Sequence, residues 1–259
     1  NISKNIDHLN HLLANTPCKE NMETFSRQMF SSIANTLGWD PKETDTDLNM
    51  ILRSNILLRL GIYGDSTTIA TAKTIFSNFK NKNTAINPDI RSVVYNLTTK
   101  ECSSSEYDEM LDLYLKASLS EERTRILNAL TYPTNPSLLK KTLEFSLTND
   151  VRQHDTIRII LGVSRNTYSQ KLAWEFIKDN WGKLNKRYGK GGFGIMSLVS
   201  IGSLFTQQND LDDYILFFNQ NPVPSADRSI KQSIEQSTLN IQWLNQNIKS
   251  TTTWLEYNL

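Results

Sequence analysis

The chain has 259 residues, enough to bury a hydrophobic core without disulfide or metal support. Its 28 Lys and Arg residues nearly balance 27 Asp and Glu residues, which gives a formal net charge of +1 and no field that would attract nucleic acid or an anionic membrane. With 38% hydrophobic residues, 10 Gly and 7 Pro, the composition excludes collagen-like and largely disordered classes. We expect a folded globular protein that does not bind nucleic acid.

Cysteine and targeting signals are sparse. Cys18 and Cys102 belong to no CxxC or Cys/His cluster, and two idle thiols are more common than one long-range bridge. No apolar run approaches the roughly 20 residues of a membrane span, and the first residues, Asn1 to Lys4, do not form a signal peptide. We expect a cytoplasmic location without direct membrane insertion, with a secretory-pathway or membrane-anchored parent protein as the alternative. The missing initiator Met indicates a fragment of a larger protein.

Apolar residues recur at spacings of three and four between turn signals, which is typical of amphipathic helices. Asn87 before Pro88 and Asn135 before Pro136 are helix-start signals. After Pro224 one stripe is traced by Ile230, Ile234, Ser237, Ile241, Leu244 and Ile248. In chain order, the pattern predicts helices over residues 3–14, 21–37, 46–62, 66–80, 88–100, 105–117, 120–131, 136–148, 153–163, 168–187, 193–205, 209–219, 225–248 and 251–257.

Many short helices joined by a few residues favour stacked antiparallel pairs over a four-helix bundle. A pair with its turns takes roughly 30–45 residues, the repeat length of HEAT and armadillo solenoids. No Pro/Ser-rich linker and no block of charge divides the chain. The sequence therefore predicts an all-α fold, a superhelical solenoid of antiparallel helix pairs formed by residues 1–259 as a single curved domain.

The three histidines do not indicate a metal or catalytic site. The chain has no HExxH motif, which a thermolysin-type zinc site requires. His8 and His11 have a spacing that places both imidazoles on one helix face, but no carboxylate or thiol ligand accompanies them. His154 lies at a predicted helix start and is interpreted as a capping or structural residue. Because the chain has only three histidines, no Ser/His/Asp-type catalytic triad can be recognised in the sequence.

The glycine-rich segment from Gly189 to Gly194 resembles a phosphate-binding loop only superficially. It follows a predicted helix instead of a buried strand, and it matches neither GxGxxG nor GxxxxGK[ST]. We interpret it as the end of one helix and the start of the next. The sequon at Asn96 lies within a predicted helix and is interpreted as a chance match. The residues alone therefore predict a non-catalytic helical solenoid that binds extended partners.

Several short segments follow one another in a characteristic order. They are Leu37-Gly38-Trp39, Leu52-Arg53-Ser54, Asn87-Pro88-Asp89-Ile90-Arg91 with Val94-Tyr95, Glu121-Glu122-Arg123, Asn135-Pro136-Ser137, Asp150-Val151-Arg152-Gln153-His154-Asp155, Ala173-Trp174-Glu175-Phe176 with Asn180-Trp181, and Asn240-Ile241-Gln242-Trp243-Leu244. In this order they resemble the C-terminal domain of zinc aminopeptidases related to aminopeptidase N, puromycin-sensitive aminopeptidase and the endoplasmic-reticulum aminopeptidases. The resemblance covers nearly the whole chain and implies a HEAT- or armadillo-like bowl.

The resemblance also implies a function. In the resembled family this non-catalytic domain encloses the active-site chamber, limits and helps bind peptide substrates, and supports an open/closed motion. Zinc and the catalytic groups belong to an upstream catalytic domain of the same protein, whose HExxH and Gly-x-Met-x-Asn motifs are absent here. We therefore expect that domain and peptide substrates as partners, zinc in the parent protein and no cofactor in this chain. The alternative is an interaction scaffold or an inactive relative that retains the bowl.

Two residues are candidates for substrate binding through this resemblance. In the endoplasmic-reticulum branch an Arg in the loop before the Ala-Trp helix is placed to hold a peptide C-terminal carboxylate, and Arg165 falls on that position. Either His8 or His11 falls near a second such position on the first helix. We expect His8 to be the second substrate-binding residue. The sequence assigns no catalytic and no metal-binding residue.

Overall fold

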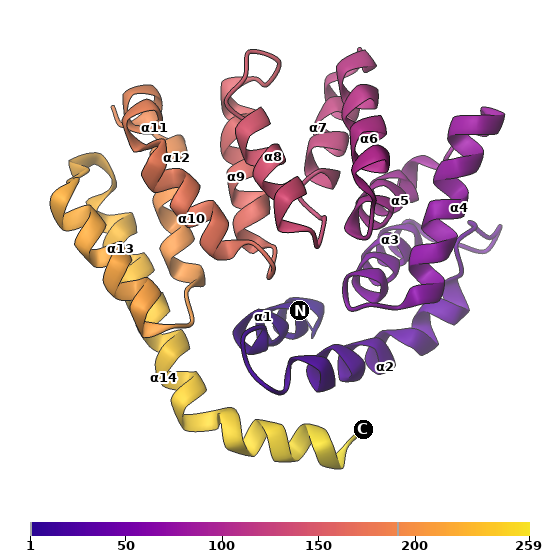
Figure 1. Ribbon diagram of the computed structural model, residues 1–259. Coiled ribbons are helices and arrows are strands. Elements are labelled where there is room, and N and C mark those ends of the chain that lie inside the picture. Colours follow the sequence, from indigo (N-terminus) through magenta and orange to yellow (C-terminus); the bar gives the residue numbers. More distant parts are fainter. Residues whose placement is uncertain (1, 191) are drawn as a thin grey trace. The chain divides into compact units, whose positions relative to one another are not determined.

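The computed structural model describes residues 2–190 and 192–259, and within these residues it contains helices and no strand (Figure 1). This confirms the predicted all-α class. The elements are α1 (Ile2–Leu13), α2 (Lys19–Leu37), α3 (Asp47–Ile62), α4 (Ser66–Lys82), α5 (Pro88–Lys100), α6 (Ser104–Lys116), α7 (Ser120–Ala129), α8 (Pro136–Phe145), α9 (Gln153–Arg165), α10 (Gln170–Asp179), α11 (Trp181–Tyr188), α12 (Phe193–Val199), the 3₁₀ helix η1 (Ser200–Leu204), α13 (Gln208–Gln220), the 3₁₀ helix η2 (Pro224–Ala226) and α14 (Asp227–Tyr257).

The chain forms two compact units. The first consists of the N-terminal segment that ends at Lys19 together with Leu139–Tyr257, and the second of Glu20–Leu138 with Asn258–Leu259. The chain therefore passes from the first unit to the second at the start of α2 and returns within α8. The organisation of residues 1–259 as one bowl-shaped domain stays a prediction.

Helix α5 forms the core of the second unit. It packs against α3, α4 and α7, and every residue from Val93 to Lys100 is buried. A Cβ atom added at Gly61 of α3 would lie 2.3 Å from the Leu97 side chain, so α3 approaches α5 this closely because residue 61 has no side chain. Asn96, the acceptor of the formal sequon, is buried in this helix.

One buried arginine ties α3 to the end of α2. Arg53 is 1% exposed, and its guanidinium donates hydrogen bonds to the carbonyl oxygens of Leu37 and Gly38, each at 3.2 Å. Gly38 has φ +64°, the left-handed conformation that commonly ends a helix. A third hydrogen bond joins Arg53 to Asp45. The Leu-Gly-Trp and Leu-Arg-Ser segments therefore contact each other. Arg53 supplies hydrogen bonds to carbonyl groups that lack a partner within α2 because the helix ends there.

A second polar network joins α5 to α7. The Tyr95 hydroxyl donates to Glu122 at 2.6 Å, Arg125 pairs with the same carboxylate, and Arg91 lies 3.6 Å from it. Burial alone would raise the pKa of Glu122, but the hydrogen bonds from Tyr95 and Arg125 and the nearby positive charges lower it. Glu122 therefore stays ionised at neutral pH, and it connects two of the segments that carry the family resemblance.

Helix α14 organises the first unit through a similar contact. It packs against η1, α12 and α13, and α13 and α14 are coloured orange and yellow in Figure 1. The Asn240 side chain, 3% exposed, donates to the carbonyl oxygens of Ser203 and Phe205 at 3.0 and 3.3 Å. The Ser237 hydroxyl donates to the same Phe205 oxygen at 3.2 Å. These bonds satisfy backbone groups around the end of η1 and fix where α14 crosses it.

The predicted helices agree with the structure in order, but the chain is divided differently from the prediction at three places. The helix expected over 168–187 breaks at Asn180, whose φ of −106° and ψ of 12° end α10, and whose side chain donates to the Phe176 carbonyl. The helix expected over 193–205 changes from α to 3₁₀ at Ser200. The two helices expected over 225–248 and 251–257 are one, α14, because no Gly or Pro interrupts the sequence between them.

Tyr95→Phe tests the network between α5 and α7. Phe retains the ring but loses the hydroxyl that donates to ionised Glu122, so the free energy of unfolding should fall by about 1.5–3 kcal/mol. Guanidinium denaturation followed by far-UV circular dichroism measures the loss. Tyr257→Phe is the matched control because Tyr257 is 89% exposed, and its change should stay within about 0.5 kcal/mol. Equal effects of the two substitutions would contradict a stabilising Tyr95–Glu122 bond.

Candidate functional site

The residue that the resemblance singles out, Arg165, lies at a tightly bonded turn between α9 and α10. It is exposed, and it is the last residue of α9, whereas the predicted helix ends at residue 163. The backbone N–H of Asn166 donates to Val163 at 3.1 Å, and the N–H of Ser169 donates to Asn166 at 3.0 Å. The buried Ser169 hydroxyl donates to Val163 at 2.8 Å. Arg165 thus projects from the start of a turn whose backbone is fixed at both ends.

Helix α10, which follows the turn, is held by the Ala-Trp-Glu-Phe segment. Trp174 is 2% exposed and packs against Tyr214 and Phe217 of α13, with ring centroids 5.3 and 5.2 Å apart. Its indole N–H donates to Asp213 at 2.6 Å, and Lys178 donates to the same oxygen at 2.7 Å. Burial would raise the pKa of Asp213, but these two hydrogen bonds lower it. This segment therefore positions α10 and the turn before it.

An aromatic residue of the turn contacts the start of α2. The Lys19 ammonium lies 4.3 Å from the centre of the Tyr168 ring, within the range of a cation–π interaction. Tyr168 remains 47% exposed. Its backbone N–H donates to the Asn166 side chain at 3.0 Å. The sequence analysis did not identify this pair, because two residues so far apart in the chain, one cation and one tyrosine, form no motif.

The two histidines of α1 lie in different environments. His8 is exposed, whereas His11 is half-buried and its Nε2 lies 2.7 Å from the Leu204 carbonyl oxygen of η1. Burial, the largest cause, and the nearby His8 lower the pKa of His11, while the bond to Leu204 opposes this shift. A substrate-binding role for His8 stays a prediction.

No metal centre is formed by the part of the chain that the structure describes, because no three His, Cys, Asp or Glu side chains in it are grouped to hold an ion. His154 is 66% exposed at the start of α9 and lies 3.6 Å from Asp155. Asp155 itself is 1% exposed and accepts a hydrogen bond from Arg152 at 2.7 Å. The carboxylate therefore fastens the first turn of α9, in agreement with the structural interpretation of this segment.

The remaining candidates carry no chemistry of their own. The glycine-rich segment ends α11 at Tyr188 and precedes α12 at Phe193, as predicted, with Gly192 at φ +100°; Gly191 lies outside the described residues. Burial raises the pKa of the Cys102 thiol to about 11, which keeps it protonated and unreactive. Among the described residues, no helix has the length and apolar character needed to cross a membrane.

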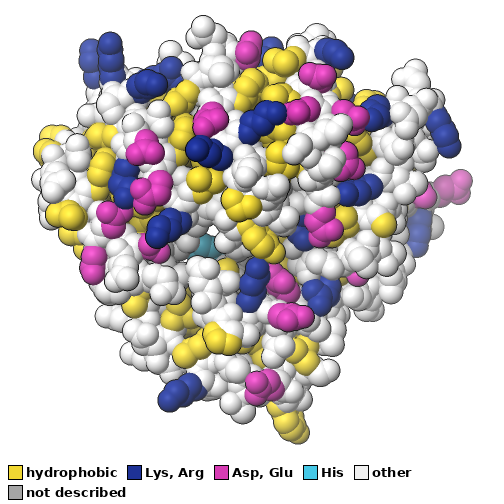
Figure 2. All heavy atoms as spheres, viewed as in Figure 1, with side chains coloured by type: hydrophobic (Ala, Val, Ile, Leu, Met, Phe, Trp, Pro, Cys, Tyr) yellow, Lys and Arg dark blue, Asp and Glu magenta, His cyan; other side chains and the backbone are white. Residues whose placement is uncertain are grey.

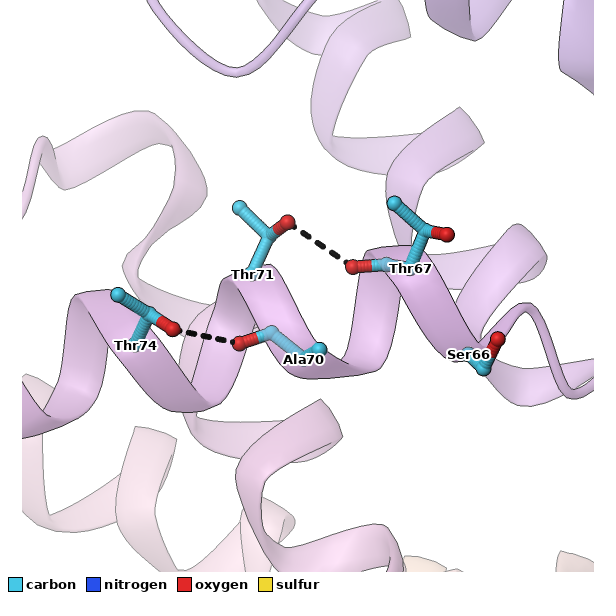
Figure 3. Close-up of a pocket in the computed structure, with 5 residues that line it drawn as sticks. All are labelled: Ser66, Thr67, Ala70, Thr71 and Thr74. Atoms are coloured by element: carbon cyan, nitrogen blue, oxygen red, sulfur yellow. Dashed lines mark hydrogen bonds between the residues drawn. The ribbon is translucent and has the colours of Figure 1, made fainter.

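An open hollow lies along one face of α4 (Figure 3). Ser66, Thr67, Ala70, Thr71 and Thr74, which line it, all belong to this helix. The Thr71 and Thr74 hydroxyls donate back to Thr67 and Ala70, each at 2.9 Å, so they offer no free donor. On the face drawn in Figure 2, the described charged side chains of both signs are interspersed, without a large area of one sign. Neither feature defines a ligand site.

These observations describe a helical domain whose characteristic segments are structural. Residues 1–239 match the family described as "ERAP1-like C-terminal domain". The chain is 29% identical over 236 residues to Aminopeptidase M1 of Arabidopsis thaliana, covering 89% of this chain and 27% of that protein. It is 30% identical to Aminopeptidase M1-B of Oryza sativa subsp. japonica (82% of this chain, 25% of that protein) and 27% identical to Endoplasmic reticulum aminopeptidase 2 of Bos taurus (91% and 25%).

The chain therefore belongs to the ERAP1-like C-terminal domain family, and it is a C-terminal domain of the type found in M1 aminopeptidases. It spans about a quarter of the length of these relatives. The family resemblance inferred from the sequence segments is confirmed.

The environment of His11 predicts a pH dependence. Because the folded state disfavours the charged imidazole, stability should be constant above the ordinary pKa near 6.5 and should fall as the pH drops below it, until the folded form is protonated as well. Thermal unfolding at several pH values between about 7.5 and 5 measures this. His11→Gln retains an N–H donor for Leu204 but cannot titrate, so its profile should be flatter. His8→Gln should retain most of the dependence of stability on pH, since burial and not His8 is the largest cause of the lowered His11 pKa. If His11→Gln leaves the pH dependence unchanged, the dependence arises from other groups.

Proposed function

We propose that this chain is the substrate-enclosing C-terminal domain of a zinc aminopeptidase that removes N-terminal residues from peptides. The observation that carries the proposal is the family match over residues 1–239, together with relatives named as aminopeptidases and roughly four times as long. The catalytic zinc and its ligands then belong to a catalytic domain outside residues 1–259, since this sequence has no HExxH motif. A cytoplasmic location is part of the same proposal.

The packing of each unit supports a solenoid that encloses a chamber. Helix α5 contacts α3, α4 and α7, and α9 contacts α10 and α12, so these helices pack mainly on helices near them in the sequence, whereas α1 contacts α14. Such nearest-neighbour packing is typical of helical-repeat proteins, which present extended binding surfaces. In the proposed role the domain closes over the catalytic site, limits the length of the peptide and excludes water in the closed form.

Arg165 is the proposed substrate-binding residue. Its side chain is exposed while the backbone that carries it is hydrogen-bonded to Val163 and Ser169, so little conformational entropy of the main chain is lost on binding. A guanidinium stays charged at all physiological pH values and binds a carboxylate with two parallel hydrogen bonds. The proposed ligand is the C-terminal carboxylate of a peptide whose N-terminus lies at the zinc.

Metal content separates this proposal from the alternative of an interaction scaffold. The chain of 259 residues should bind no stoichiometric zinc and should not hydrolyse aminoacyl-coumarin substrates, whereas the parent protein should do both and should lose activity with a chelator. Metal analysis and a fluorescence assay on both proteins test this. A parent protein without zinc or hydrolysis would favour the scaffold, and chelator-sensitive activity of the 259-residue chain alone would overturn the assignment of the chemistry to another domain.

Arg165→Ala in the parent protein tests the carboxylate site. The ratio of kcat/KM for a long peptide to kcat/KM for a single-residue substrate should fall about ten- to a hundredfold, since a hydrogen-bonded contact to a charged group is worth about 1.5–3 kcal/mol. Amidation of the peptide C-terminus should mimic the substitution, and the two changes together should be less than additive. Equal losses on short and long substrates, or full additivity, would show that Arg165 does not contact the carboxylate.

A further inference from the structure

The electrostatics of the first turn of α2 make Lys19 an unusual choice for its position. Lys19 is the first residue of this helix, where the helix dipole favours acidic side chains and disfavours a cation. Its ammonium instead lies over the Tyr168 ring, 4.3 Å from the ring centre. The contact with Tyr168 therefore offsets part of the unfavourable interaction between the Lys19 charge and the helix dipole.

The contact reaches the turn that carries Arg165. Tyr168 is three residues beyond Arg165, which limits the separation of their Cα atoms to about 10 Å, and the Tyr168 and Ser169 N–H groups both bond to Asn166. The turn is therefore one hydrogen-bonded piece, attached to α9 at one end and to α10 at the other. The contact between Lys19 and the Tyr168 ring also joins the turn to the start of α2, a segment far away in the sequence.

We propose that Lys19 and Tyr168 are positioning residues for Arg165, and that their cation–π contact holds the turn in the orientation that receives a peptide carboxylate. Lys19 and Tyr168 both belong to the first unit. The kinetic part of the proposal rests on the proposed function of Arg165, whereas the structural part does not.

The structural part is tested by amide hydrogen exchange on the 259-residue chain. Lys19→Gln and Tyr168→Ala should each raise the exchange rates of residues 168 and 169 about two- to fivefold, the range expected for losing an exposed cation–π contact. Lys19→Arg and Tyr168→Phe retain a cation and a ring and should restore protection. Lys183→Gln is the matched control, because Lys183 is exposed on α11. Unchanged exchange in both disruptive variants would overturn the proposal whatever Arg165 does.

The kinetic part is tested with the same variants in the parent protein. Lys19→Gln and Tyr168→Ala should lower the long-peptide to single-residue ratio of kcat/KM about two- to fivefold, mainly through KM, and both conservative variants should restore it. If exchange rises and Arg165→Ala lowers the ratio but the Lys19 and Tyr168 variants do not, the contact does not position Arg165 and the proposal is wrong. If exchange rises and Arg165→Ala also leaves the ratio unchanged, the proposed function of Arg165 has failed, and the positioning role fails with it.

Discussion

The fold depends on buried side chains that donate hydrogen bonds to the backbone of a neighbouring helix. An isolated helix below about 12–15 residues is marginally stable in water, and α7, α10 and α12 have ten residues or fewer. Apolar burial attracts such helices to one another but does not specify their register. Arg53 at the end of α2 and Asn240 at the end of η1 contribute to that register, because each donates hydrogen bonds to two carbonyl groups of a neighbouring element.

The segments by which the chain resembles aminopeptidase C-terminal domains coincide with these contacts. Arg53 joins one pair of segments, Tyr95 and Glu122 join another, and Trp174 fastens α10 to α13 through Asp213. None of these side chains is arranged as a nucleophile, a general base or a metal ligand. The segments therefore identify the fold, while Arg165, the residue proposed to contact substrate, lies at the end of α9 beside them. This separation is expected of a scaffold that holds its binding residues in loops.

Helix order and the all-α class followed from local signals, since the caps at Asn87 and Asn135 and the apolar periodicity act within one helix turn. The break at Asn180 was missed because an Asn within an amphipathic pattern does not by itself mark the end of a helix. The hydrogen bond from its side chain to the Phe176 carbonyl is visible only in the structure. Arg165 was expected in a loop, yet α9 extends to include it. The Lys19–Tyr168 contact was beyond sequence analysis, because it joins residues that only tertiary packing brings together. Local rules thus predicted the elements, and the candidate site depends on contacts between distant parts of the chain.

The position of Arg165 at the end of α9 has an electrostatic consequence for carboxylate binding. The C-terminal end of a helix carries a partial negative charge, which favours Arg165 itself but repels an approaching carboxylate. A second cation near the turn offsets this repulsion, and Lys19, held over Tyr168, is such a cation. Arg165 lies at the start of the hydrogen-bonded turn, whereas Lys19 reaches the turn from the start of α2. If Arg165 binds a carboxylate as proposed, the contact between Lys19 and Tyr168 would also make the local field more favourable for that anionic ligand.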